Sequence, residues 1–140
     1  MNEKPAIAAA VALGITAAAA AGQGYSPRAQ VVAELRRQHL LMQPNGPFKY
    51  EFFAPVARAY WNPRGEVVIW EFRTRARAAA AADRIAPDGN TGNTIGGHHV
   101  LWKGVPHWFR RGRVIALYLG GDSPVRRALT RVLGRQIAGS

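Results

Sequence analysis

The sequence predicts an α+β domain: an antiparallel sheet of about five to six strands with two helices packed on one face, preceded by an N-terminal helix. Three observations predict it. The chain has 140 residues, 48% of them hydrophobic, which suffices for one modest core. An amphipathic segment opens the region 25–140, which is expected to form a single domain. Two apolar hairpin patterns are each followed by a helical pattern: 56–72 before 75–85, and 107–121 before 124–134.

Residues 1–24 predict a signal peptide or a membrane anchor. After a short start with one lysine, the chain is apolar from Ala6 to Gly22, except for Thr16 and two glycines, and then turns polar. This order is typical of a secretory signal. As a transmembrane helix the segment is shorter than the usual length of about 20 residues and is mostly alanine, so a tether is the second interpretation. An alanine-rich soluble helix is the third, disfavoured because the segment has no polar face. The segment therefore predicts a cell-envelope location, with the protein either exported or membrane-anchored.

The domain is expected to begin with a helix over residues 26–42. Ser26 is a suitable N-cap, and Pro27 fits the first helical position, where its missing N–H costs nothing. The run PNGP at 44–47 is expected to end this helix. FKYEFFA, at 48–54, is the first predicted strand.

The hairpin at 56–72 places apolar residues on both faces of its second strand. By the period of two, one face carries Val68, Trp70 and Phe72, and the other Val67 and Ile69. Thr74 can cap the following helix, whose alanines allow close packing against a sheet.

HHVLW, at 98–102, predicts a further strand, and residues 107–121 predict a hairpin with Gly112 in its turn. Both faces of its second strand are mostly apolar, so this strand is expected to be central: Ile115, Leu117 and Leu119 face one way, and Val114, Ala116 and Tyr118 the other.

The last helix is expected to start at a cap supplied by Asp122 or Ser123 and to end at Gly134. Helical spacing gives it a buried stripe of Val125, Leu129, Val132 and Leu133. Its outer face carries Arg127, Arg131 and Arg135.

Three segments carry a resemblance: EVVIWEFRTRARAAAAADRIAPDGNT, VLWKGVPHWFRRGRVIALYLGGDSP and VLGRQIAG. Together, over residues 66–139, they resemble a group of small uncharacterised exported bacterial proteins with a similar strand–helix–PDG order and a GRVI-type strand before an aspartate. The resemblance implies location and architecture, and no activity.

The charge is strongly positive: 19 Lys and Arg against 8 Asp and Glu give a net charge of +11. Such a chain attracts nucleic acid, anionic lipid and acidic protein surfaces. A GC-rich genome, which favours alanine and arginine over lysine, is the alternative explanation. Cysteine is absent, which excludes disulfides, thiolate metal sites and a cysteine nucleophile.

The sequence indicates no catalytic, cofactor-binding or metal-binding residues. Of the four histidines, His98 and His99 are neighbours, which point to opposite faces of a strand and do not easily share a metal. The glycine-rich stretches lack the lysine and spacing of a phosphate loop. The protein is therefore expected not to be an enzyme, although a small-molecule enzyme without a recognisable motif stays open.

One constellation is a candidate partner-binding surface, because it combines cations with aromatic residues. Its members are Lys103, His107, Trp108, Arg110, Arg111, Arg113, Arg127 and Arg131. Solvated arginines at a hairpin tip are the plainer explanation. The favoured hypothesis is a non-enzymatic basic module that docks onto an acidic protein surface or anionic lipid, as an accessory subunit of a membrane or envelope assembly. Nucleic-acid binding through the basic and aromatic hairpin is the alternative.

Overall fold

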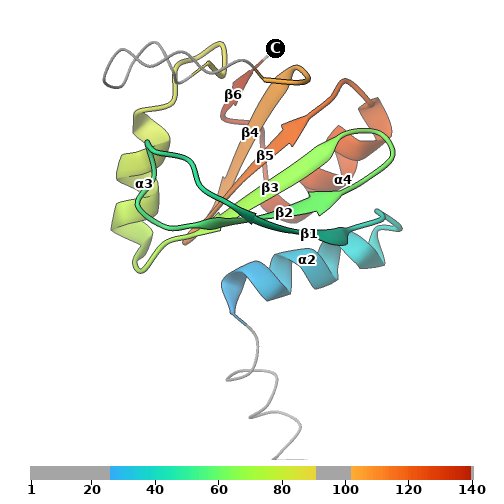
Figure 1. The fold of residues 1–140 in the computed structure, drawn as a ribbon, viewed down its shortest axis with the longest axis horizontal. Coiled ribbons are helices and arrows are strands. Elements are labelled where there is room, and N and C mark those ends of the chain that lie inside the picture. Colours follow the sequence, from blue (N-terminus) through green and yellow to red (C-terminus); the bar gives the residue numbers. More distant parts are fainter. Residues whose placement is uncertain (1–25, 91–101, 140) are drawn as a thin grey trace, which may run out of the picture.

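The computed structural model describes residues 26–90 and 102–139. Three helices and six strands are present there (Figure 1): α2 (Pro27–Arg37), β1 (Gln43–Phe48), β2 (Ala57–Trp61), β3 (Glu66–Glu71), α3 (Arg75–Asp83), β4 (Pro106–Arg111), β5 (Val114–Leu119), α4 (Ser123–Leu133) and β6 (Ala138–Gly139). The strands form one antiparallel sheet in the order β1-β2-β3-β5-β4-β6. The predicted α+β fold is confirmed. The predicted leader or anchor at 6–22 lies outside the described residues, as does the strand predicted at 98–102 except for Trp102, which is in no strand.

The helices begin where the sequence predicts. Ser26 Oγ accepts a hydrogen bond from the Ala29 amide at 3.1 Å, and Thr74 Oγ1 accepts one from the Arg77 amide at 3.0 Å. The third cap is Asp122, not Ser123. The side chains of these caps satisfy amides that the first turn of a helix leaves without partners.

Apolar residues cover both faces of the sheet, so the domain has two core clusters. The cluster on the α2–α4 face contains Val67 and Ile69 of β3 with the buried stripes of α2 and α4. The cluster on the α3 face contains Val68 and Trp70 of β3 with Ala78 of α3. All residues of β5 are buried, and β5 lies between β3 and β4, as predicted for a central strand.

The distribution of helices differs from the prediction. The pair that shares a face is α2 and α4, whereas α3 covers the opposite face (Figure 1). Both faces of β3 and β5 are apolar, so each needs a cover. Large rings, including Trp70 and Trp108, fill much of the α3 face, and the small Ala78 and Ala81 of α3 pack beside them.

The first strand also differs from the prediction. β1 spans Gln43–Phe48 and includes the PNGP run that was expected to end the first helix, which instead ends at Arg37. An edge strand tolerates proline, and the pairing with β2 shifts register between Pro44 and Pro47. The predicted strand at 48–54 is instead mostly an irregular segment, from which Tyr50, Phe52 and Phe53 are buried on the α3 face.

Candidate functional site

The β4–β5 hairpin holds the core of the predicted partner-binding constellation, with Gly112 in its turn at φ +58°. Its two aromatic members do not reach the surface. Trp108 is 0% exposed, stacks on Trp70 at 5.6 Å and donates from Nε1 to the Gly89 carbonyl at 2.7 Å. His107 is 2% exposed and stacks on Tyr118. The two rings are therefore not exposed to stack on a partner, because β4 is covered on both faces.

Arg111 lies at the junction of three elements. Its guanidinium donates to both carboxylate oxygens of Glu34 in α2, at 3.0 and 2.8 Å, and to the Val132 carbonyl near the end of α4 at 2.7 Å. The hydrogen bond from Arg111 holds the pKa of Glu34 below its usual range. Arg111 thus ties both helices to β4, and it is more than a solvated charge at a hairpin tip.

Arg110 and Arg113 also have partners nearby. Arg113 Nε donates to the Phe72 carbonyl at 2.8 Å, and its Nη2 lies 3.8 Å from Glu71 Oε2. Arg110 Nη1 donates to the Gly112 carbonyl at 2.9 Å, inside the hairpin turn itself. The contacts of Arg113 therefore connect the hairpin to the end of β3, whereas the contact of Arg110 stays inside the turn.

The remaining predicted members are exposed, in two separate places. Lys103 lies in the irregular segment before β4. Arg127 and Arg131 lie on the outer face of α4, as predicted. The structure therefore does not bring the constellation together on one surface.

On α4, polar residues line an open hollow of about 450 Å³, which we call the α4 groove. Its lining residues are Ser123, Arg126, Arg127, Thr130, Arg131 and Gln136. Five of the six recur at spacings of three or four residues, which brings them to one side of a helix. Sequence reasoning missed Arg126, although it follows Ser123 at this spacing.

The hydrogen bonds that hold the groove arginines are long. Arg126 Nη2 lies 3.4 Å from Ser123 Oγ, and Arg131 Nη1 lies 3.4 Å from Gln38 Oε1 in α2. No carboxylate lines the groove. The acidic residue at the start of α4, Asp122, lies outside the lining: it caps the helix and pairs with Arg64 at 2.7 Å. Its pKa is lowered chiefly by Arg64, and also by the charge of Arg127. The groove is thus a concentrated positive surface available to an external anion.

Two further features, a cluster of metal-ligating side chains and a membrane-spanning helix, are absent from the described residues. Within 26–90 and 102–139 there is no group of three or more His, Cys, Asp or Glu side chains suited to a metal ion. The same ranges contain no helix with the length and apolar character needed to span a membrane.

The fold and the groove define the class of the molecule as a basic α+β domain with helices on both faces of an antiparallel sheet. Comparison of the chain with protein-family models, curated proteins and solved structures gives no match. The resemblance to small exported bacterial proteins stays a prediction.

Proposed function

We propose that this domain is a non-enzymatic basic module that docks onto an acidic protein surface through the α4 groove. The observation that carries the proposal is the presence of three arginines, Arg126, Arg127 and Arg131, in a groove that no carboxylate lines. Unbalanced exposed charges of one sign attract a partner of opposite charge and speed its association.

The use of carboxylates inside the domain supports the same interpretation. Glu34 pairs with Arg111, Glu71 lies against Arg113, and Asp122 pairs with Arg64. These acids stabilise contacts between elements, whereas the lining of the α4 groove contains three arginines and no carboxylate. Arg64, Arg111 and Arg113 thus contact acids within the domain. The arginines of the α4 groove are the ones proposed to bind an external partner.

The lining of the groove favours a protein partner. Every lining residue is of a polar type, so the groove has no large apolar side chain that could insert among lipid chains. It also offers no aromatic ring on which a base can stack. Arginine forks suit the carboxylates of an acidic protein surface. With the apolar segment Ala6 to Gly22, this favours an accessory subunit of an assembly at the bacterial cell envelope, exported or anchored.

The test compares two double variants of equal charge. Arg127→Gln with Arg131→Gln removes two charges from the groove, and Arg73→Gln with Arg77→Gln removes two exposed charges beside and within α3. Binding of a labelled polyglutamate peptide, followed by fluorescence anisotropy at about 0.15 M salt, is expected to weaken about tenfold for the groove variant and much less for the control.

Equal losses in both variants would show attraction to net charge alone and would overturn the docking surface. Anionic vesicles and single-stranded RNA are the parallel arms. If the vesicles or the RNA bind in a way that depends on the groove arginines, and the peptide does not bind, the partner is lipid or nucleic acid and the proposed acidic protein partner is wrong.

A further inference from the structure

A second arginine cluster lies in a cleft between α2 and the β1–β2 edge of the sheet. The cleft has a volume of about 330 Å³, at the lower end of the range for small-molecule sites. We call it the α2 cleft. Its lining residues are Arg28, Ala29, Val32, Arg36, Pro44, Gly46, Arg58, Ala59 and Tyr60.

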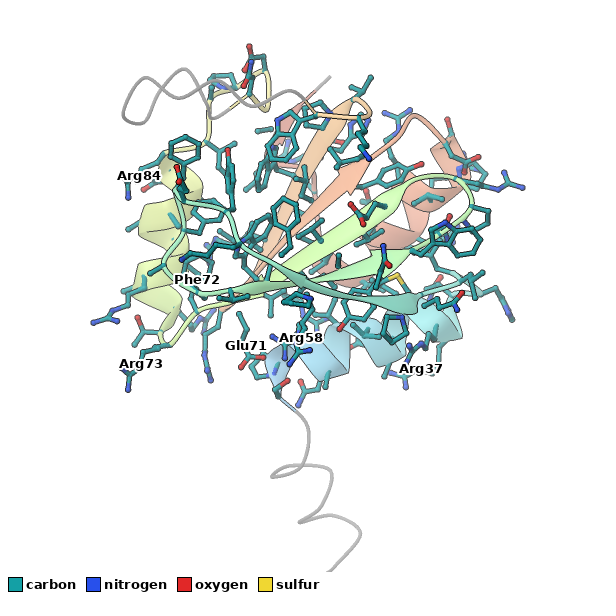
Figure 2. All side chains as sticks on the ribbon, in the orientation of Figure 1. Arg37, Arg58, Glu71, Phe72, Arg73 and Arg84 are labelled. Atoms are coloured by element: carbon teal, nitrogen blue, oxygen red, sulfur yellow. The ribbon has the colours of Figure 1, made fainter. Side chains whose placement is uncertain are left out.

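The fold explains how three arginines from distant parts of the chain meet there. Arg28 and Arg36 are eight residues apart on one side of α2, or about 12 Å along the helix axis, with Val32 between them. Arg58 comes from β2. It pairs in register with Ile69, which belongs to the α2–α4 core, so Arg58 projects on the side of the sheet that α2 covers. Figure 2 shows Arg58 beside α2.

The lining of the α2 cleft contains no counter-charge for its three guanidinium groups. No carboxylate lines the cleft, and no ion pair of the described residues includes Arg28, Arg36 or Arg58. The carboxylate of Glu71 accepts a hydrogen bond from the backbone amide of Arg28 at 2.9 Å and lies against Arg113. The one acid within α2, Glu34, is held by Arg111. Three like charges around a small space repel one another, and a bound anion relieves that repulsion.

One of these arginines is also held in position. Arg36 Nη2 donates to the Met42 carbonyl at 2.6 Å, which limits the orientations of its guanidinium. A fixed planar fork gives up less conformational freedom when it binds an oxyanion.

From this geometry we infer that the α2 cleft binds a small phosphomonoester, with the phosphate held among Arg28, Arg36 and Arg58 and a compact apolar group against Val32 and Tyr60. A phosphate carries up to two negative charges and three acceptor oxygens, which fits several guanidinium groups approaching from two elements. A carboxylate carries one charge and two oxygens. The apolar walls of the cleft favour an ester over free phosphate.

The probe is phenyl phosphate, compared with inorganic phosphate and with benzoate by isothermal titration calorimetry on the full chain. Phenyl phosphate is expected to bind in a saturable way and more tightly than either of the others. Arg58→Gln is expected to weaken it at least about tenfold, because a hydrogen-bonded charge pair is lost. Arg58→Lys, which keeps the charge and loses the fork, is expected to lie between.

The matched control is Arg73→Gln, an exposed arginine outside the cleft, which is expected to bind phenyl phosphate as the wild type does. Backbone amide shifts in NMR spectra are expected at Ala29, Val32 and Gly46. The absence of saturable binding, or equal losses in Arg58→Gln and Arg73→Gln, would overturn the inference. The double variant Arg127→Gln with Arg131→Gln is expected to bind phenyl phosphate as the wild type does, because neither residue lines the α2 cleft. The test of the cleft and the test of docking through the α4 groove can therefore fail independently.

Discussion

The two faces of the sheet are closed by different kinds of interaction. On the α3 face, rings from the irregular segment after β1 pack edge-on against the sheet: Phe53 meets Trp70 at 5.1 Å and Trp108 at 5.9 Å. On the α2–α4 face, branched aliphatic residues of two helices form the core, and the Arg111–Glu34 pair ties the helices at the edge. Burial of large rings needs no charge. The helical face depends partly on charge, and the same face carries both arginine-lined hollows, the α4 groove and the α2 cleft.

The largest effect is expected on the α3 face. Trp108→Ala should lower the free energy of unfolding by about 3–5 kcal/mol, because the ring is fully buried and its removal leaves a cavity. Leu129→Ala, on the opposite face, should cost about 2–5 kcal/mol. Chemical denaturation measures the free energy of unfolding of both variants.

Trp61→Ala is the control, since Trp61 is 46% exposed, and should change the free energy of unfolding by no more than about 0.5 kcal/mol. A smaller loss for Trp108 than for Trp61 would contradict the assignment of the aromatic core.

Much of this contrast was predictable from periodicity. The alternation in the strands ending at Phe72 and Leu119 correctly separated the residues of the two faces. The caps and the outer positions of Arg127 and Arg131 on α4 were also predicted correctly, because both depend on local spacing. Arg135, predicted on the same face of the helix, instead lies beyond the end of α4 at Leu133.

What the sequence did not predict depends on long-range contacts. Tyr50 and Phe52 alternate like strand residues but are buried from an irregular segment, and β1 forms through two prolines because it pairs on one side only. Trp108 looked like a surface ring because nothing local shows that β4 is covered on both faces. The pairing of Arg111 with Glu34, 77 residues away, has no signature in spacing.

A smaller effect is expected from Arg111, which tests the part that charge plays on the α2–α4 face. Arg111→Gln should lower the free energy of unfolding by about 1–2 kcal/mol, more than most exposed pairs, because two hydrogen bonds to Glu34 and one to the Val132 carbonyl are lost. A double-mutant cycle with Glu34→Gln measures the coupling. A coupling near zero would show that the pair does not hold the helices together.

The effect of Arg111 is expected to depend on pH. The pKa of Glu34 is lowered in the folded domain, chiefly by the hydrogen bond from Arg111. Such a carboxyl contributes stability above its unfolded pKa of about 4.3, and that stability is lost as the pH falls through the lower folded value. The difference in unfolding free energy between the wild type and Arg111→Gln should therefore be constant near neutral pH and shrink below about pH 4. A difference that grows on acidification would contradict this linkage.

The smallest effect is expected from the neighbouring residue Arg110. Adjacent strand residues point to opposite faces, so Arg110 projects toward the α3 face, whereas Arg111 reaches the helices. The side-chain bond of Arg110 to the Gly112 carbonyl stays within the same turn, which Gly112 already favours through its positive φ. Arg110→Gln should therefore change the free energy of unfolding by no more than about 0.5 kcal/mol, as thermal or chemical denaturation will measure. A loss equal to that of Arg111→Gln would mean that any arginine in this hairpin stabilises the domain to the same degree. The two faces of the β4–β5 hairpin would then not differ in how much an arginine contributes to stability. The contrast between an α3 face stabilised by packed rings and an α2–α4 face stabilised partly by charge would not hold in this hairpin.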